Sequence, residues 1–286
     1  MTIKLSSNNY GKSRVRLVRI TRGAEEHHLK DISVDIQFEG DFEAVHVQGD
    51  NRNVLPTDTM KNTVYALASQ EPIAEIEEFG LRLAGHFLEN NPQVRNVRVA
   101  LSERQWARIR VEGRPHPWAF VAGRPDRRTA LVSGTLAGYS IQAGIEDLLV
   151  LKSNESAFEG YIHDRFTTLP ETSDRIFATV VKANWSYSHR DVAFGRFWEG
   201  VRSILLQTFA LHRSESVQHT LYAMAGAVLD AFGEIDAIRL SMPNKHHLPV
   251  DLTPFELENR NEVFVATDEP YGLIEAVVRR DSGFHF

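Results

Sequence analysis

The chain has 286 residues, of which 42% are hydrophobic and 24% charged, and 32 basic against 38 acidic residues give a net charge of -6. These values are typical of a globular protein with a sizeable core and disfavour a nucleic-acid partner, which favours a basic surface. The absence of cysteine excludes disulfides, thiolate catalysis and cysteine-based metal sites. No apolar run reaches the ~18 residues of a membrane span and the polar start lacks a signal peptide's core, so we expect a cytoplasmic protein without a membrane partner.

Hydrophobic periodicity predicts two similar series of elements along the chain. The first series is strand-strand, helix-helix, strand-strand, with elements expected over residues 15–20, 31–47, 60–68, 73–89, 97–101 and 107–111. In its second helix the apolar residues recur every three or four positions and predict one buried stripe, formed by Ile76, Phe79, Leu83 and Phe87.

The second series repeats this order after a proline-rich stretch, residues 113–125, that is typical of a loop or an edge strand. Its strands and helices are expected over residues 129–151, 194–211, 215–232, 237–240, 263–266 and 273–278. The pattern repeats but the residues do not. Two units are therefore predicted, over residues 1–126 and 127–286.

Each unit is predicted to be of the α+β class, an antiparallel sheet with a helix pair on one face. Such a unit covers only one face of its sheet. Symmetric oligomers that close their sheets into barrels remove exposed edges. We therefore expect a homo-oligomer, although the sequence does not set the number of its subunits.

Metal and nucleotide sites are not predicted from motif spacing. The chain has no His-Glu-x-x-His, P-loop, Gly-x-Gly-x-x-Gly or Gly-x-Ser-x-Gly motif. The histidines of His27-His28 and of His246-His247 are adjacent, and neighbours on a strand point to opposite faces.

Four other segments carry unusual polar residues, and each has an ordinary interpretation. A lysine near a strand start is usually solvated, Thr and Asp before a helix are usual N-caps, aromatic residues usually pack, and polar residues after a strand usually form a turn. A helix start, however, also offers free backbone N–H groups to an anion. These segments are Asn8–Lys12, Pro56–Asn62, Lys152–Arg175 and Leu240–His247.

Taken together, the segments resemble the urate oxidase family, whose members oxidise urate with molecular oxygen. The resemblance spans nearly the whole chain, from Tyr10-Gly11-Lys12 to Gly272-Leu273-Ile274. Its most specific blocks are Pro56–Tyr65, the Lys152–Tyr161 segment continuing through Phe166 and Leu169 to Arg175, the pair Val217-Gln218, and the run Ser241–His247. Several blocks in the expected order are far more specific than any one of them.

The resemblance implies a fold and an assembly. Family members consist of tandem T-fold units and form homotetramers that enclose a tunnel, with active sites at subunit interfaces. They use no cofactor and no metal, and O2 is the co-substrate.

The resemblance also assigns substrate-binding roles. Phe158 would stack on the flat purine, and the planar fork of Arg175 would bind one edge of the urate anion. Gln218 would present an amide edge and Val217 a backbone N–H. Thr57 and the backbone of Asp58, from the neighbouring subunit, would close the opposite edge.

The catalytic roles would fall to Lys12, Thr57, Asn244 and His246. A threonine hydroxyl is a poor base alone, but a lysine with a lowered pKa could take its proton. His246 would complete the relay, since imidazole titrates near neutral pH. Asn244, with Thr57, would bind oxygen and then water above the ring, while His247 is expected to be structural.

Two alternatives remain open from the sequence. One is a relative of the same fold acting on pterins, such as a cyclohydrolase or an aldolase, whose metal-dependent members need ligands that are not found here. The other is an inactive purine-binding tetramer, which the joint presence of the four catalytic residues disfavours. The chain ends in Phe284-His285-Phe286 rather than in a peroxisomal tripeptide, which favours a bacterial cytoplasmic family member.

Overall fold

The computed structural model describes residues 3–189 and 191–281, so the prediction for the C-terminal tripeptide lies outside the described residues. Contacts divide the chain into two compact units, Met1–Gly144 with Ala193–Gly195, and Ile145–Val192 with Arg196–Phe286. Both combine antiparallel strands with helices, which confirms the α+β class. The predicted boundary after residue 126 falls inside the strand Arg114–Thr135. This strand pairs along its length with a strand of the first unit, and the contacts divide the chain after residue 144.

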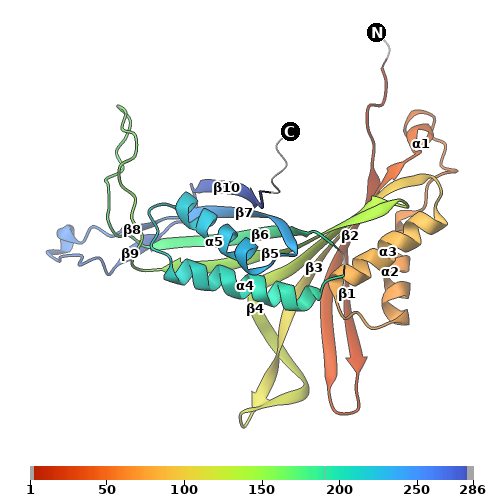
Figure 1. Cartoon of the computed structure of the whole chain (residues 1–286), viewed down its shortest axis with the longest axis horizontal. Coiled ribbons are helices and arrows are strands. Elements are labelled where there is room, and N and C mark those ends of the chain that lie inside the picture. The colour runs from red at the N-terminus through yellow and green to blue at the C-terminus, as the bar shows by residue number, and fades with distance from the viewer. Residues whose placement is uncertain (1–2, 190, 282–286) are drawn as a thin grey trace. The chain divides into compact units, whose positions relative to one another are not determined.

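The first unit contains four antiparallel strands in the order β1-β2-β3-β4, with α2 and α3 on one face (Figure 1). Its elements are β1 (Tyr10–Arg22), β2 (His27–Gly40), α1 (Glu43–Val47), α2 (Thr57–Gln70), α3 (Ile76–Asn90), β3 (Val94–Val111) and β4 (Arg114–Thr135). Alternate residues of β2 are fully buried, namely Ile32, Val34, Ile36 and Phe38. The predicted stripe of α3 is confirmed, and its Phe87 ring lies 5.0 Å from that of Phe38.

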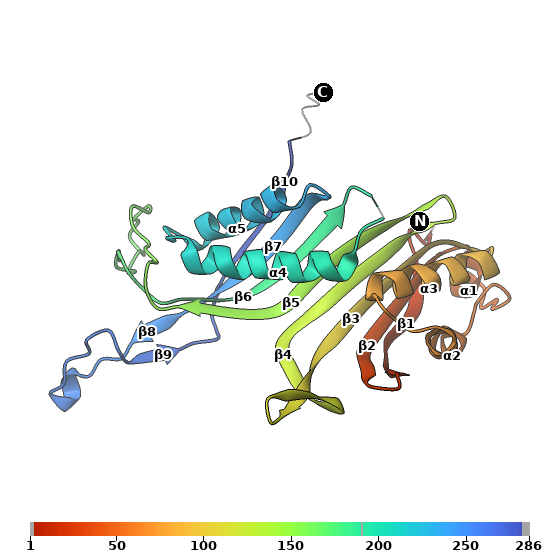
Figure 2. The ribbon, with the colours of Figure 1, turned by 60° about the horizontal axis from the view of Figure 1, so that its bottom comes forward.

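The second unit contains strands in the order β5-β6-β7-β10, with α4 and α5 side by side over one face (Figure 2). Its elements are β5 (Gly138–Lys152, which starts in the first unit), β6 (Phe177–Tyr187), α4 (Phe194–Leu211), α5 (Val217–Ala231), β7 (Ile235–Lys245), β8 (His247–Pro249), η1 (Thr253–Phe255), β9 (Phe264–Ala266) and β10 (Gly272–Arg279). The largest buried side chains of this unit are Trp185, Trp198 and Phe177.

Most predicted elements are present, with several differences. The strands expected over 97–101 and 107–111 form the single strand β3, and the short strand β8 was not predicted. The strand expected over 31–47 ends at Gly40, and Glu43–Val47 is the short helix α1, because Phe42 turns inward and packs against Tyr10. Strand β6 was not predicted, although its alternate residues are buried. The proline-rich stretch 113–125 forms most of the first half of β4, in a part of the β3–β4 pairing that contains register shifts.

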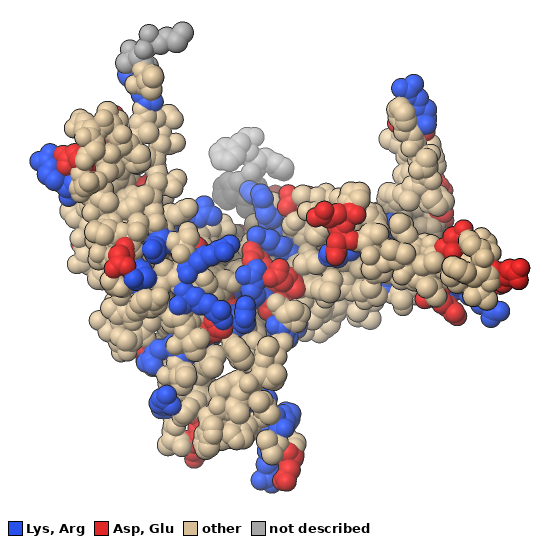
Figure 3. All heavy atoms as spheres, turned by 180° about the vertical axis from the view of Figure 1, so that it is seen from behind, with Lys and Arg blue, Asp and Glu red and all other residues tan. Residues whose placement is uncertain are grey.

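The face of the first sheet opposite the helices is polar and rich in arginine. A hollow of about 470 Å³ on this face is lined by Arg14, Arg16, Asp31, Ser33, Asp35, Ser102, Arg104 and Arg127. Asp31 binds Arg16 through two short hydrogen bonds, which lower the pKa of the buried carboxyl. Basic side chains gather on the side of the molecule that is hidden in Figure 1 (Figure 3).

No helix within the described ranges combines the length and the apolar character needed to cross a membrane.

A buried ion-pair cluster joins α3 to β4. The Arg128 guanidinium lies 2.7 Å from the Glu75 carboxylate and 2.6 Å from that of Glu77, and the side chains of Arg128 and Glu77 are 6% and 0% exposed. Burial raises the pKa of the Glu77 carboxyl, and the nearby guanidinium opposes this rise. Buried charges are stable only when they are paired at hydrogen-bonding distance. The ion pairs therefore specify one position of α3 against β4, whereas apolar packing alone does not.

We therefore expect Arg128→Met to lower the free energy of unfolding by about 3–5 kcal/mol, because it leaves two carboxylates near the interior without their partner. The measurement is urea unfolding at a fixed protein concentration. Arg260→Met is the matched control, because Arg260 faces Glu258 at 3.9 Å on the surface, and it should cause no measurable loss. Equal effects of the two substitutions would contradict the importance of the buried cluster.

Candidate active site

The first group of predicted site residues lies in the first unit, where β1 contains a bulge next to Lys12. Lys12 pairs with Ile36 of β2, but Val15 pairs with Val34, so two residues of β1 oppose one of β2. Side chains alternate along a strand, so without the bulge Lys12 would share a face with Arg14. The bulge instead places Lys12 on the same face as the buried Val15, which is the face that the helices cover.

Two local features hold the bulge in place. Arg14 has a left-handed backbone with a φ of 55°, and its N–H donates to the Asp35 carboxylate at 2.9 Å. A β-carbon on Gly11 would collide with the carbonyl oxygen of Ile36, so only glycine allows the two strands to approach here. The hydrogen bond to Asp35 of β2 thus stabilises the strained backbone conformation of Arg14.

Tyr10 ties the start of β1 to the loop before α2. Its hydroxyl accepts from the Leu55 N–H at 3.0 Å and donates to the Leu55 carbonyl at 3.3 Å. Its ring meets that of Phe42 edge-on at 4.7 Å, and burial raises the pKa of the phenol. Because Leu55 is two residues before Thr57, this contact brings the helix start to Lys12.

Helix α2 begins without a side-chain cap, which overturns the interpretation of its Thr and Asp as N-caps. Thr57 and Asp58 are the first two helical residues, and Pro56 occupies the N-cap position. The Asp58 carboxylate is instead bound by Lys61 and, at 3.0 Å, by Asn62, and the hydrogen bond from Lys61 is the main cause of its lowered pKa. The amides of the first turn are therefore open to a ligand.

The second group lies in the second unit, where the chain before Phe158 is joined to the start of α5. Ala157 donates its N–H to the Ser214 carbonyl at 2.7 Å, and Ser214 donates to Glu155 at 3.0 Å. The Arg175 N–H donates to the Ser156 carbonyl at 2.7 Å. Three segments that are distant in sequence thus meet at Ser156.

These contacts place Arg175 over Phe158. The guanidinium carbon lies 5.0 Å from the centre of the Phe158 ring, which stacks in turn on Tyr161 at 4.7 Å. The Nε of Arg175 is buried and has no hydrogen-bond partner among the described residues. Burial lowers the pKa of the guanidinium. A buried N–H without a partner is costly, and an anionic ligand would satisfy it.

Helix α5 begins at the other two predicted binding residues, Val217 and Gln218. Ser216 caps the helix by accepting the N–H of His219 at 3.1 Å. The Ser214 hydroxyl donates to the Ser216 carbonyl at 3.1 Å. The cap uses the third amide of the helix, so the Val217 amide remains available at the positive end of the helix dipole.

Asn244 and His246 lie at the end of β7, also in the second unit. Asn244 pairs with Thr179 of β6 on one side and with Gly272 of β10 on the other. The His246 carbonyl accepts the N–H of Thr267 at 2.9 Å. His247 starts β8 and its Nδ1 lies 3.2 Å from the carbonyl of Lys245. In the described part of the chain, no three His, Cys, Asp or Glu side chains are grouped so that they could hold a metal ion.

The structure therefore brings Lys12, Thr57 and Asp58 together in the first unit, and Phe158, Arg175, Val217 and Gln218 together in the second. Sequence reasoning missed the residues that support them. Ser216 could have been identified as a helix cap from its type and position. Tyr10 belongs to a block of the family resemblance, but its supporting contact could not be predicted, and no sequence signal marks Asp35 or Ser214, because the partners of all three are distant in the chain.

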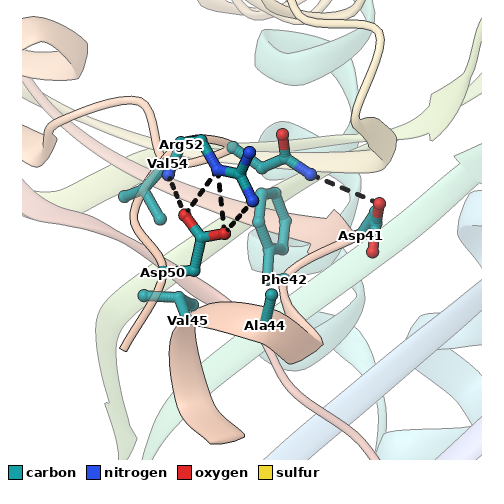
Figure 4. Close-up of a pocket in the computed structure, with 8 residues that line it drawn as sticks. Asp41, Phe42, Ala44, Val45, Asp50, Arg52 and Val54 are labelled. Carbon is teal, nitrogen blue, oxygen red and sulfur yellow. Dashed lines mark hydrogen bonds and ion pairs between the residues drawn. The ribbon is translucent and has the colours of Figure 1, made fainter. Parts of the chain in front are cut away.

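A separate hollow of about 260 Å³ lies beside α1 (Figure 4). It is crossed by the ion pair of Arg52 with Asp50, and Asn53 donates to Asp41 at 3.3 Å. None of the predicted site residues lines it. We therefore assign it no part in the site.

The fold and the two groups of residues define an α+β protein whose candidate ligand-binding groups collect at helix starts and strand ends. The family model described as Uricase matches residues 8–133 and 141–275. The chain belongs to the uricase family.

Individual relatives agree with this assignment. The chain is 47% identical to the uricase of Arthrobacter globiformis, over 98% of this chain and 91% of the relative. It is 38% identical to the uricase of Dictyostelium discoideum, over 96% of this chain and 97% of the relative. The crystal structure of the Arthrobacter globiformis uricase superposes with a TM-score of 0.94 at 45% identity, covering 100% of this chain and 98% of that one.

The bulge beside Lys12 gives a direct test. Arg14→Val disfavours the left-handed backbone of the bulge and Asp35→Ala removes its hydrogen bond, so the double variant should favour regular pairing. Regular pairing without a bulge turns Lys12 to the opposite sheet face, and urate turnover should fall on the order of 100-fold or more. The measurement is the rate of urate loss, with circular dichroism to verify folding. Arg14→Gly keeps the bulge and relieves its backbone strain, so it should retain turnover and gain about 1 kcal/mol of stability. Normal turnover by the folded double variant would show that the bulge does not orient a required residue.

Proposed function

We propose that this uricase-family chain carries out its urate oxidase activity without a cofactor, as a cytoplasmic homotetramer. Its two T-fold units close into a barrel around a tunnel. Thr57 and Asp58 of one copy complete the pocket formed by another. Membership of the uricase family supports this assembly. It is also supported by polar groups that lack a partner in each group of site residues, namely Arg175 Nε in the second unit and the uncapped first amides of α2 in the first.

In this proposal the second unit holds the substrate. Urate is flat and anionic, so its ring stacks on Phe158 and its edge takes the bidentate fork of Arg175. Gln218 and the Val217 amide bind the remaining polar edge. Thr57 and the Asp58 amide close the opposite edge from the neighbouring copy, where the uncapped start of α2 favours negative charge.

The reaction needs a base and a place for oxygen. Lys12 takes the proton of the Thr57 hydroxyl, which then deprotonates urate, and His246 relays protons. The electron-rich anion reduces O2 and forms a ring hydroperoxide above the ring, where Asn244 and Thr57 bind oxygen. Loss of hydrogen peroxide leaves a dehydro intermediate, and water adds to it. Urate, O2 and water thus become 5-hydroxyisourate and hydrogen peroxide.

The observation that carries the binding proposal is the unpartnered Nε of Arg175, buried beside the face of Phe158. An arginine that only stabilised the fold would be expected to use its donors within the protein. A stacking surface and a cationic fork at one place are what a planar anion requires.

The cofactor-free reaction predicts full activity after treatment with a chelator. Purified protein is dialysed against the chelator and mixed with urate, and the loss of ultraviolet absorbance and the release of peroxide are followed together. One peroxide should form per urate consumed. A requirement for added metal would overturn the cofactor-free proposal, and urate binding without turnover would favour the inactive purine-binding alternative.

Binding and catalysis should separate between two variants. Arg175→Lys loses the bidentate fork that binds urate, so KM should rise on the order of 10–100-fold. Thr57→Ala removes the hydroxyl of the proton relay, so kcat should fall strongly while much urate affinity remains. Steady-state kinetics measures both. A normal kcat for Thr57→Ala would show that its catalytic assignment is wrong.

A further inference from the structure

Two residues in the first turns of α2, Lys61 and Asn62, have no part in the reaction as proposed. Both bind the side chain of Asp58. The Lys61 ammonium contacts Oδ1, and the Asn62 amide donates to Oδ2 at 3.0 Å. Both carboxylate oxygens are therefore engaged within the helix.

The charge of Lys12 on β1 acts on the Asp58 carboxylate of α2, and the two elements pack against each other. The charge of Lys12 is among the causes that lower the pKa of the Asp58 carboxyl, so the two side chains are within electrostatic range. Lys12 lies on the sheet face that α2 covers. Arg14 on β1 and Asp35 on β2 line the hollow of the opposite face. The charged groups on α2 that bear on Lys12 are thus Asp58 and, through its ion pair with Asp58, Lys61. The Tyr10 phenol lies two residues before Lys12 on β1 and is bound to Leu55.

A carboxylate near a lysine stabilises the ammonium form, which cannot accept a proton. A base must be neutral when it acts. The carboxylate would be least harmful to such a base if its own charge were already neutralised by another cation.

We propose that Lys61 and Asn62 hold the Asp58 carboxylate within α2 and so prevent it from pairing with the Lys12 ammonium. Lys61 and Asn62 are then positioning residues, which touch neither substrate nor oxygen. The inference rests on the proposed role of Lys12 as the base. Asp58 can present its backbone N–H to the substrate because its side chain is bound elsewhere.

The test is the pH profile of kcat in the full-length enzyme. Lys61→Met releases the carboxylate to pair with the Lys12 ammonium, so the acid limb of kcat should move to higher pH by about half to one pH unit. Asn62→Leu should move it in the same direction by less. Adding Asp58→Asn to Lys61→Met removes the released charge and should return the limb to its wild-type position.

Two controls separate this effect from general charge and from folding. Lys182→Met removes one positive charge of β6 from its surface pair with Glu146 of β5 and should leave the acid limb unchanged. Lys61→Arg keeps the ion pair and should also keep the wild-type limb. Thermal melting verifies that each variant is folded.

The outcomes distinguish this inference from the proposed function. An acid limb that stays in place in Lys61→Met and Asn62→Leu, while Lys12→Met lacks turnover, would overturn the inference alone. Normal turnover by Lys12→Met would overturn the role of Lys12 as the base, and the inference with it. A shifted limb that Asp58→Asn does not restore would also overturn the inference, because the carboxylate would not be its cause.

Discussion

The position of α3 on the sheet of the first unit depends on the buried guanidinium of Arg128. Apolar packing between α3 and the sheet is strong but not directional, since each buried side chain contributes about 1.5–3 kcal/mol wherever it is covered. The ion pairs of Arg128 with Glu75 and Glu77 fix where the first turn of α3 lies along β4. Helix α2 packs beside α3 and against β1, so the position of Thr57 next to Lys12 follows from this arrangement.

The two helix starts of the candidate site are prepared in different ways. Helix α5 has a serine cap that satisfies one amide and leaves the amides before it open. Helix α2 has no side-chain cap, and its one carboxylate points to its own next turn rather than to its amides. In α2 the carboxylate that could have neutralised the helix start is engaged elsewhere, and in α5 the cap is an uncharged serine that accepts only one amide. Both starts therefore keep the positive potential that an anionic substrate needs.

Much of the fold could be predicted because it follows from periodicity. The bounds of α4 were predicted to the residue, since one apolar face continues through the whole helix. Strand β6 was missed because it follows a long irregular segment and its buried positions include Ala183 and Thr179, which carry little hydrophobic signal. The residue types of the site could be predicted from family resemblance. The bulge beside Lys12 could not, because it depends on hydrogen bonding to a carboxylate on another strand.

The unsatisfied polar atoms of the second unit give an independent argument for its pocket. Proteins pair nearly all of their buried polar groups. In this unit the buried atoms without a partner among the described residues include Ser156 Oγ, Arg175 Nε, Thr179 Oγ1 and Thr220 Oγ1. Thr179 pairs with Asn244 along the sheet, and Thr220 lies one turn into α5 from Ser216. Ser156 and Arg175 thus flank Phe158 in the chain, Thr220 lies on the helix that begins at Val217, and Thr179 is the strand neighbour of Asn244. Buried groups without a partner lower stability, and a polar ligand with ordered water would supply partners for those that lie beside the predicted binding residues.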